Sequence, residues 1–291
     1  MIAGIDLGGT QARVALARPD GRIVRTRRTP TGSLGGPMGL VNWASEALDS
    51  LRNGDPLNAV GVGAAGPVDQ VRGRLVNPPN LPGWRDVPLA ADLSRKLSCP
   101  VHLENDANVA ALAEFHQGAG RGARTMIYIT WSTGVGGGLV IDGRLFSGAH
   151  GSAGEIGHMI LDPDGPLDGC GQRGCLEAFC GGGSLERQTG MTAAEIFEGA
   201  AAGRPEAAGI VRRAAAYMGQ ALVSLTNIID PEVIVIGGGV TRSWSQVGPA
   251  LKEALRGSPF IRPGRRPHLR RARLGDRVGE VGAVEWARAN L

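Results

Sequence analysis

Short apolar segments alternate with glycine-rich turns over the first thirty residues. "MIAGIDL", "QARVALA" and "RIVRTRR" predict three strands, separated by the turns "GGT" and "RPDG". The same order returns more than a hundred residues later, in "TMIYITW", "STGVGGG", "LVI", "DG" and "RLFSG". Two strand–hairpin units with glycine-rich first turns predict two related domains.

Helical and strand patterns alternate between and after these units. Apolar residues between Leu40 and Leu51 recur at helical spacing, and Gly54 and Pro56 end that helix. "VHLENDANVAALAEFHQGAG" predicts a strand, a turn and a helix, and "DPEVIVIGGGV" predicts a strand that ends in glycines. We therefore expect an α/β chain with mixed sheets. The expected domains are residues 1–107, a small α/β domain, and residues 108–278, a large one, with a C-terminal helix over about 279–291 that packs back on the first.

Length and charge narrow the class of protein. The chain has 291 residues, enough for two domains, and no apolar run approaches the roughly 20 residues of a membrane span. It starts on a strand, which leaves no room for a signal peptide, so we expect a cytoplasmic protein. The net charge of +4 comes almost entirely from arginine. The cluster "RPGRRPHLRRAR" (Arg262 to Arg273) can be read as a nucleic-acid patch, but we favour a solvated loop and strand, because aromatic residues make up only 4%. We expect neither a nucleic-acid nor a membrane partner.

Three glycine-rich turns follow predicted strands, and there is no P-loop lysine. Glycines at such turns let backbone N–H groups approach a phosphate. Each turn alone is a weak signal, but the three together, in this order, are specific. Asp6, beside the first turn, can hold the waters of a Mg²⁺ ion. The candidate residues for binding a phosphate group and its metal ion are Asp6, Gly8, Gly9, Thr10, Thr133, Gly134, Gly237, Gly238 and Gly239.

"ENDAN" places Asp106 at a strand-to-helix junction. One interpretation is helix capping by Asn105 or Asp106. The other is a carboxylate base at the carboxyl end of a strand, where α/β proteins hold ligands and where phosphoryl transfer needs a proton acceptor. Asn80, in the rigid loop "NPPNLPGW", together with Glu155 and His158 in "GSAGEIGH", offers polar groups that suit the hydroxyls of a sugar.

These motifs together resemble the ROK family of bacterial sugar kinases and repressors. The resemblance runs nearly end to end through "DLGGT", "GPVD", "NPPNLPGW", "ENDANVAALAE", "STGVGGGLV", "GEIGH", "CGQRGCLE" and "DPEVIVIGGGV". It implies a two-domain actin-like ATPase (ribonuclease-H-like) fold with a cleft between the domains, and ATP and Mg²⁺ as cofactors. Only five residues precede Asp6, so we expect no helix-turn-helix module. The resemblance implies that Asp106 is the catalytic base and that Gly66, Asn80, Asn105, Glu155, His158 and Glu177 contact the sugar.

The same resemblance implies a structural zinc site within residues 158–180. The family holds Zn²⁺ with a histidine and three cysteines of a C-x-C-G-x-x-G-C motif. This chain has His158, Cys170 and Cys175 but Asp168 at the place of the first cysteine. Three alternatives stay open: Asp168 supplies an oxygen ligand, which we favour; Cys180 supplies a third sulfur; or no metal is bound.

The sequence thus predicts an ATP- and Mg²⁺-dependent hexose kinase that forms a sugar 6-phosphate. Glucose is the favoured substrate, and N-acetylmannosamine or N-acetylglucosamine are the alternatives. A sugar-binding sensor without catalysis is the alternative from another class of protein. The resemblance also implies a homodimer or homotetramer.

Overall fold

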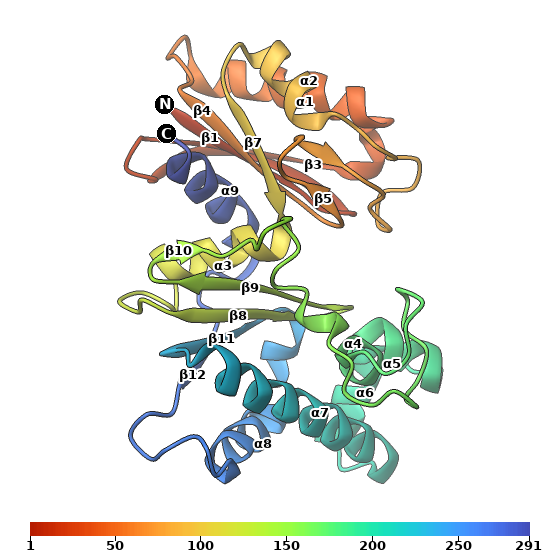
Figure 1. Ribbon diagram of the computed structural model, residues 1–291. Coiled ribbons are helices and arrows are strands. Elements are labelled where there is room, and N and C mark those ends of the chain that lie inside the picture. The colour runs from red at the N-terminus through yellow and green to blue at the C-terminus, as the bar shows by residue number, and fades with distance from the viewer. The chain divides into compact units, whose positions relative to one another are not determined.

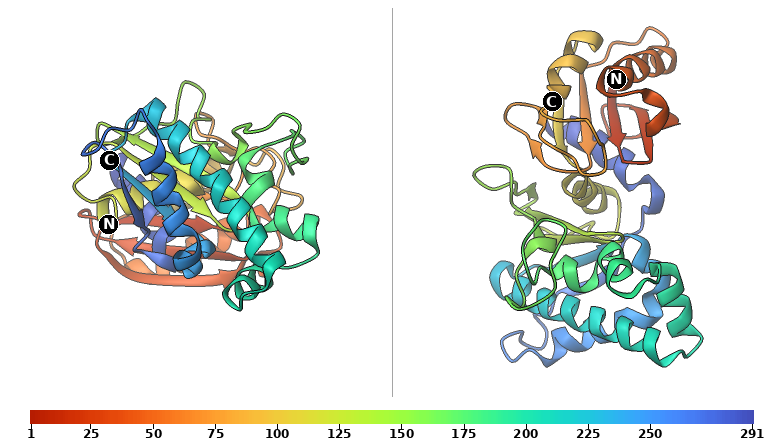
Figure 2. Two further views of the ribbon diagram at one scale, coloured as in Figure 1. Left: turned by 90° about the horizontal axis from the view of Figure 1, so that it is seen from below. Right: turned by 90° about the vertical axis from the view of Figure 1, so that its right-hand side faces the viewer.

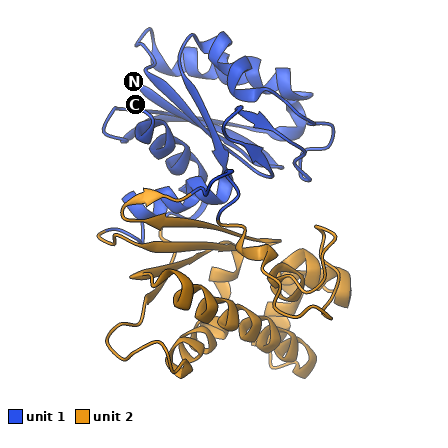
Figure 3. Cartoon of the chain, viewed as in Figure 1, with its two compact units in different colours: residues 1–121, 147–153, 274–291 blue, residues 122–146, 154–273 orange.

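The computed structural model describes all 291 residues, which form two compact units (Figure 3). Unit 1 comprises residues 1–121, 147–153 and 274–291, and unit 2 comprises residues 122–146 and 154–273. The boundary expected after residue 107 therefore falls inside unit 1.

Unit 1 is built on a five-stranded sheet with helices on both faces (Figure 1). The strand order is β3-β2-β1-β4-β7, in which β1 to β3 are antiparallel and β1, β4 and β7 are parallel. Side chains alternate along β1, so that Ile5 packs with α1 and α2 while Ile2 packs with α9. The elements are β1 (Ile2–Leu7), β2 (Gln11–Ala17), β3 (Ile23–Pro30), α1 (Pro37–Arg52), β4 (Ala59–Ala64), β5 (Val68–Asp69), β6 (Arg74–Leu75), α2 (Leu89–Leu97), β7 (Val101–Asn105), α3 (Asp106–Gln117) and α9 (Val278–Ala289).

Glycines explain why α3 and α9 belong to unit 1. A Cβ atom on Gly61 of β4 would overlap the carbonyl of Ala283 in α9, so the helix backbone lies directly on the strand. A Cβ on Gly63, two residues on, would lie 2.5 Å from the Val109 side chain of α3. Both helices thus pack on the face of β4 that carries no side chains there, and the unit boundary moves beyond α3. The C-terminal helix folds back onto the sheet of unit 1.

Unit 2 repeats the strand arrangement of unit 1. Its order is β10-β9-β8-β11-β12, again with antiparallel hairpin strands followed by parallel ones. This confirms the duplication predicted from the two glycine-rich hairpin units. Helices α7 and α8 lie side by side in the second core (Figures 1 and 2). The elements are β8 (Met126–Trp131), β9 (Val135–Ile141), β10 (Arg144–Leu145), α4 (Leu176–Cys180), α5 (Gly182–Thr189), α6 (Ala193–Ala201), α7 (Pro205–Ile229), β11 (Val233–Gly237), α8 (Trp244–Gly257) and β12 (His268–Arg271).

Trp131 belongs to this second core. It is 2% exposed, and its indole N–H donates a 2.7 Å hydrogen bond to the carbonyl of Cys180. Trp131 therefore packs in the core of unit 2. None of the helices is both long enough and apolar enough to cross a membrane.

Candidate functional site

The candidate residues of unit 1 gather where three parallel strands end. Leu7 of β1, Ala64 of β4 and Asn105 of β7 are in register across the sheet, so the segments that follow them leave from one edge. The first of these segments is the glycine turn, closed by a 3.0 Å hydrogen bond from Gly8 N–H to the Gln11 carbonyl. The predicted residues at this edge are Asp6, Gly8, Gly9, Thr10, Gly66, Asn105 and Asp106.

Asp6 is a mostly buried carboxylate at the end of β1. Its side chain is 18% exposed and lies 3.6 Å from the Arg13 guanidinium. Burial raises the pKa of Asp6 to about 6; Arg13 opposes this shift and Glu280 adds to it. A Cβ atom on Gly279, at the start of α9, would lie 2.5 Å from the carboxylate, so the helix backbone covers it closely.

Asn105 and Asp106 lie at the start of α3, and both side chains accept a hydrogen bond from that helix. Asn105 is the N-cap of α3, and its side-chain oxygen accepts the Ala107 N–H at 2.8 Å. Asp106 is the first helical residue and is exposed, although its Oδ1 also accepts the Ala107 N–H, at 2.9 Å. The capping role thus falls mainly to Asn105, and an exposed carboxylate is left at the edge of the sheet.

Two loops contact this junction from the same unit. Asn105 donates its amide to the Gly66 carbonyl at 3.1 Å. Gly66 has a φ of 102° and lies so close to Pro78 that a Cβ would be 2.7 Å from the Pro78 Cα. Two residues further on, Asn80 packs against Gly9, where a Cβ would lie 2.9 Å from the Asn80 Cβ. The first glycine turn and the predicted sugar-binding loop are therefore in direct contact.

A pocket of about 460 Å³ opens beside this contact in unit 1. Its walls come from the first glycine turn, from the loop between β3 and α1, and from the loop that carries Asn80. The lining residues are Gly9, Thr31, Gly32, Gly35, Gly36, Pro37, Asn80, Leu81, Pro82, Gly83 and Trp84.

In unit 2 the second and third glycine turns lie at the carboxyl ends of two neighbouring strands. Strands β8 and β11 are parallel neighbours, with Thr130 opposite Gly237. The turn at Thr133 and Gly134 follows β8, and Gly238 and Gly239 follow β11. Gly238 has a φ of 80° and lies against the Trp131 backbone, which leaves no room for a side chain. The second and third glycine turns thus follow neighbouring strands at the same end of the sheet.

Glu177 connects the second glycine turn with the loop of residues 158–180. Its Oε2 accepts the Val135 N–H at 2.6 Å, and a Cβ on Gly134 would overlap the carboxylate. Glu155 is the N-cap and His158 the last residue of a short 3₁₀ helix, in which the His158 N–H donates to the Glu155 carbonyl at 3.1 Å. The sequence assigned Glu177 to the sugar alone and missed its bond to the turn, because nothing local links residues 42 positions apart.

The four predicted metal ligands converge in unit 2. One donor atom from each of His158, Asp168, Cys170 and Cys175 lies within 4.8 Å of the others. The two sulfurs are 3.7 Å apart, and His158 Nδ1 lies 3.3 Å from Asp168 Oδ2. A tetrahedral ion at about 2.3 Å from sulfur and about 2.0–2.1 Å from nitrogen and oxygen needs edges of about 3.8 and 3.3 Å, close to those found.

The chemistry of the donors agrees with this geometry. Buried polar atoms without partners include His158 Nδ1 and Asp168 Oδ1. Burial tends to raise the pKa of Asp168, but hydrogen bonds from Cys170 and Gly169 and the nearby His158 bring it below its usual value. Burial and the neighbouring Cys170 raise the pKa of Cys175 to about 12, so that without a bound cation its thiol is protonated at neutral pH. The residues present fit a zinc ion.

Cys180 lies outside this group. It is buried in α4, and its thiol donates to the Leu176 carbonyl at 3.2 Å. The alternative in which Cys180 completes the metal site is therefore wrong for this structure, because its side chain points into the core.

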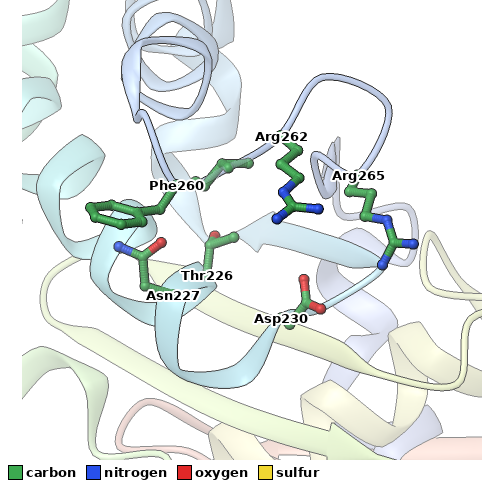
Figure 4. A pocket seen from close by; sticks show the side chains of 7 residues that line it. Thr226, Asn227, Asp230, Phe260, Arg262 and Arg265 are labelled. Atoms are coloured by element: carbon green, nitrogen blue, oxygen red, sulfur yellow. The ribbon is translucent and has the colours of Figure 1, made fainter.

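A further pocket in unit 2, of about 520 Å³, lies at the C-terminal end of α7 (Figure 4). Arg262, Arg265 and Asp230 face it, beside the exposed ring of Phe260. Asp230 precedes β11, whereas the third glycine turn follows that strand, so pocket and turn lie at opposite ends of β11. This pocket is not part of the candidate site.

Comparison with known proteins identifies the family. The model of the ROK family matches residues 2–290. A glucokinase of Halalkalibacterium halodurans is 34% identical over 96% of this chain and 92% of its own length. An N-acetylmannosamine kinase of Yersinia pestis is 33% identical over 99% of this chain and 98% of its own.

Two solved structures are similar over nearly the whole chain. A ROK hexokinase from Thermus thermophilus is 38% identical with a TM-score of 0.88, covering 99% of this chain and 98% of the other. A ROK family glucokinase from Streptomyces griseus, in complex with glucose and AMPPNP, is 33% identical with a TM-score of 0.79, covering 99% of both chains. The chain belongs to the ROK family and has the two-domain actin-like ATPase fold that its sequence predicted.

Proposed function

We propose that this protein transfers the γ-phosphoryl group of ATP to the 6-hydroxyl of a hexose, with glucose as the preferred substrate. The observation that carries the proposal is the exposed Asp106 carboxylate beside the fixed Asn105, at the sheet edge that also carries the first glycine turn. Phosphoryl transfer to a hydroxyl needs three kinds of group close together: a base, an amide that contacts the sugar, and a turn that binds phosphate.

Asp106 accepts the proton of the sugar 6-hydroxyl as that oxygen forms its bond to the γ-phosphorus. The bond from the γ-phosphorus to the bridging oxygen breaks, and ADP leaves with the bonding electrons. We assign the sugar contacts to Gly66, Asn80, Asn105, Glu155, His158 and Glu177.

The three glycine turns bind ATP in this proposal, through backbone N–H groups that cost no reorganisation during the reaction. Asp6 would hold Mg²⁺ through its waters, and the ion when bound neutralises phosphate charge. Although burial raises its pKa to about 6, this value is still below neutral pH. The carboxylate is therefore ionised at neutral pH, as metal binding requires.

Zinc, in this proposal, is held by His158, Asp168, Cys170 and Cys175 and plays a structural role. It would fix the loop that carries Glu177, and coordination at His158 Nδ1 leaves Nε2 for a sugar hydroxyl. Elemental analysis of protein purified without added metal tests this. We expect about one zinc per chain; active enzyme with almost none would contradict the proposal.

An N-acetylmannosamine kinase is the second candidate, favoured by the relatives of that name at about one-third identity over nearly the full chain. Discrimination depends on the pocket around one or two sugar substituents. We also propose that the protein acts in the cytoplasm as a homodimer or homotetramer; light scattering that found only monomers would contradict the assembly.

The deciding experiment measures ADP release with ATP and Mg²⁺ across glucose, mannose, fructose, N-acetylglucosamine and N-acetylmannosamine. We expect the highest kcat/KM for glucose. Asp106→Asn should abolish turnover and leave sugar binding, measured by calorimetry, largely intact. Near-normal rates in this variant would refute the base assignment, and silence on every sugar in folded protein that binds one would favour a sensor.

A further inference from the structure

Glu104 is a buried carboxylate two residues before the proposed base, Asp106. It is the penultimate residue of β7 and is 1% exposed. Its Oε1 accepts the backbone N–H of Asn105 at 2.8 Å and the side-chain amide of Asn108 at 3.0 Å. The hydroxyl of Ser147 also lowers its pKa. One side chain thus holds groups from both the strand and the helix.

These hydrogen bonds lie at a strand-to-helix junction that contains no loop residues. Strand β7 ends at Asn105 and helix α3 begins at Asp106, so one residue changes from extended to helical backbone. Glu104 fixes the last residue of the strand and, through Asn108, the first turn of the helix. The directions of the Asn105 and Asp106 side chains follow from where that turn begins.

The simplest interpretation is that Glu104 is an ordinary core residue. The free-energy cost of burying its carboxylate argues against that interpretation. Burial raises its pKa despite the hydrogen bonds that oppose the shift, so its charged form is disfavoured. Its Oε2 and the Asn108 Oδ1 are both buried acceptors without a partner. An apolar side chain of similar size would avoid these costs. A carboxylate at position 104 therefore lowers the stability of the fold, and it provides a hydrogen-bond acceptor at the strand-to-helix junction.

We propose that Glu104 is a positioning residue of the phosphoryl-transfer site, which acts on the sugar through Asn105 and on the base through the start of α3. It does not touch the substrate. This inference rests on the proposed function, in which Asp106 is the base and Asn105 contacts the sugar.

The experiment compares three variants in the full chain. Glu104→Gln keeps one acceptor oxygen, and Glu104→Met keeps the length of the side chain but offers no acceptor. Glu285→Gln is the matched control: Glu285 is 2% exposed, and it holds the other end of α3 through Gln117 at 2.6 Å. Glucose and ATP dissociation constants are measured by calorimetry, kcat and KM by ADP release, and folding by thermal midpoints.

We expect glucose affinity and kcat to fall about tenfold in Glu104→Met, which has no acceptor, and to stay within about threefold in Glu104→Gln, which keeps one, while the ATP dissociation constant stays within twofold in both. Thermal stability should not fall in Glu104→Gln, because the amide removes the buried charge and keeps an acceptor oxygen. Glu285→Gln should leave glucose affinity and kcat within twofold. Equal effects of Gln and Met, or parallel losses of glucose and ATP affinity, would overturn the inference.

Failure of the inference is distinct from failure of the proposed function. If Glu104→Gln and Glu104→Met bind and turn over glucose normally while Asp106→Asn is inactive, the function stands and the positioning role is refuted. If Asp106→Asn keeps its rate, the function fails whatever the Glu104 variants do.

Discussion

Replacing Asp6 by Asn should stabilise the fold while it removes activity. The pKa of Asp6 lies near 6 in the folded chain, against 3.8 for a free aspartate, because burial disfavours the charge more than Arg13 favours it. A group whose folded pKa is raised in this way binds a proton more tightly when folded. Its contribution to stability is therefore present below pH 3.8 and is lost as the pH rises through 6.

The magnitude follows from the shift. A rise of about two pKa units costs about 3 kcal/mol of unfolding free energy at pH 7.5, and the cost falls to about 1 kcal/mol at pH 4.5. Asparagine carries no charge and still offers Arg13 an oxygen. We therefore expect Asp6→Asn to be about 2–3 kcal/mol more stable than the natural chain at pH 7.5, and about 1 kcal/mol more stable at pH 4.5.

The assay is the thermal midpoint of the protein free of Mg²⁺ and nucleotide, at both pH values. The expected gain at pH 7.5 is roughly 5 °C or more. Asp55→Asn is the control, because Asp55 is exposed and its loss removes the same charge without relieving burial. If Asp6→Asn is less stable at pH 7.5, the ion pair with Arg13 outweighs burial. If its gain is the same at both pH values, the stability difference does not come from the raised pKa of Asp6. Either result refutes the reasoning.

Three shorter predictions test other contacts. Gly9→Ala should raise the KM for glucose several-fold, because its Cβ would lie 2.9 Å from Asn80, whereas Gly32→Ala, with no atom within 4 Å, should change it little; steady-state kinetics decides. Asp168→Cys should slow zinc loss to a chelator and Asp168→Ala should speed it, as followed by a metal-sensitive dye; unchanged rates in both would exclude Asp168 as a ligand. Trp131→Phe should lower the unfolding free energy by about 1–3 kcal/mol, because the buried Cys180 carbonyl loses its donor, and denaturant titration would detect this.

Local patterns predicted the repeated architecture and most of the candidate site. Glycine turns after apolar strands are visible within about ten residues, and parallel strands bring their carboxyl ends to one edge. Asp6, Asn105 and Asp106 therefore stand out as candidate site residues from the amino-acid sequence alone. The grouping of His158, Asp168, Cys170 and Cys175 came instead from a family resemblance, and the fold brings these residues together.

The domain boundary could not be predicted because it depends on contacts distant in sequence. Helix α3 begins at Asp106, directly after strand β7, and this change of element favours a break there. Its attachment to unit 1 comes from Gly63 beneath Val109 and from Gly282 of α9, whose Cβ would overlap the Val109 carbonyl. Glu104 was missed for a similar reason: a carboxylate in a half-polar strand resembles a solvated residue until Asn108 and Ser147 are seen beside it.

Exposed arginines lie on an edge strand of each sheet. Strand β3 is an edge of the first sheet and carries Arg25, Arg27 and Arg28, all exposed; β12 is an edge of the second and carries Arg270 and Arg271. An edge strand presents unpaired backbone groups that can pair with another molecule, and exposed charges oppose such pairing. Because these arginines lie on both edge strands, their charge protects each sheet from pairing with a strand of another molecule.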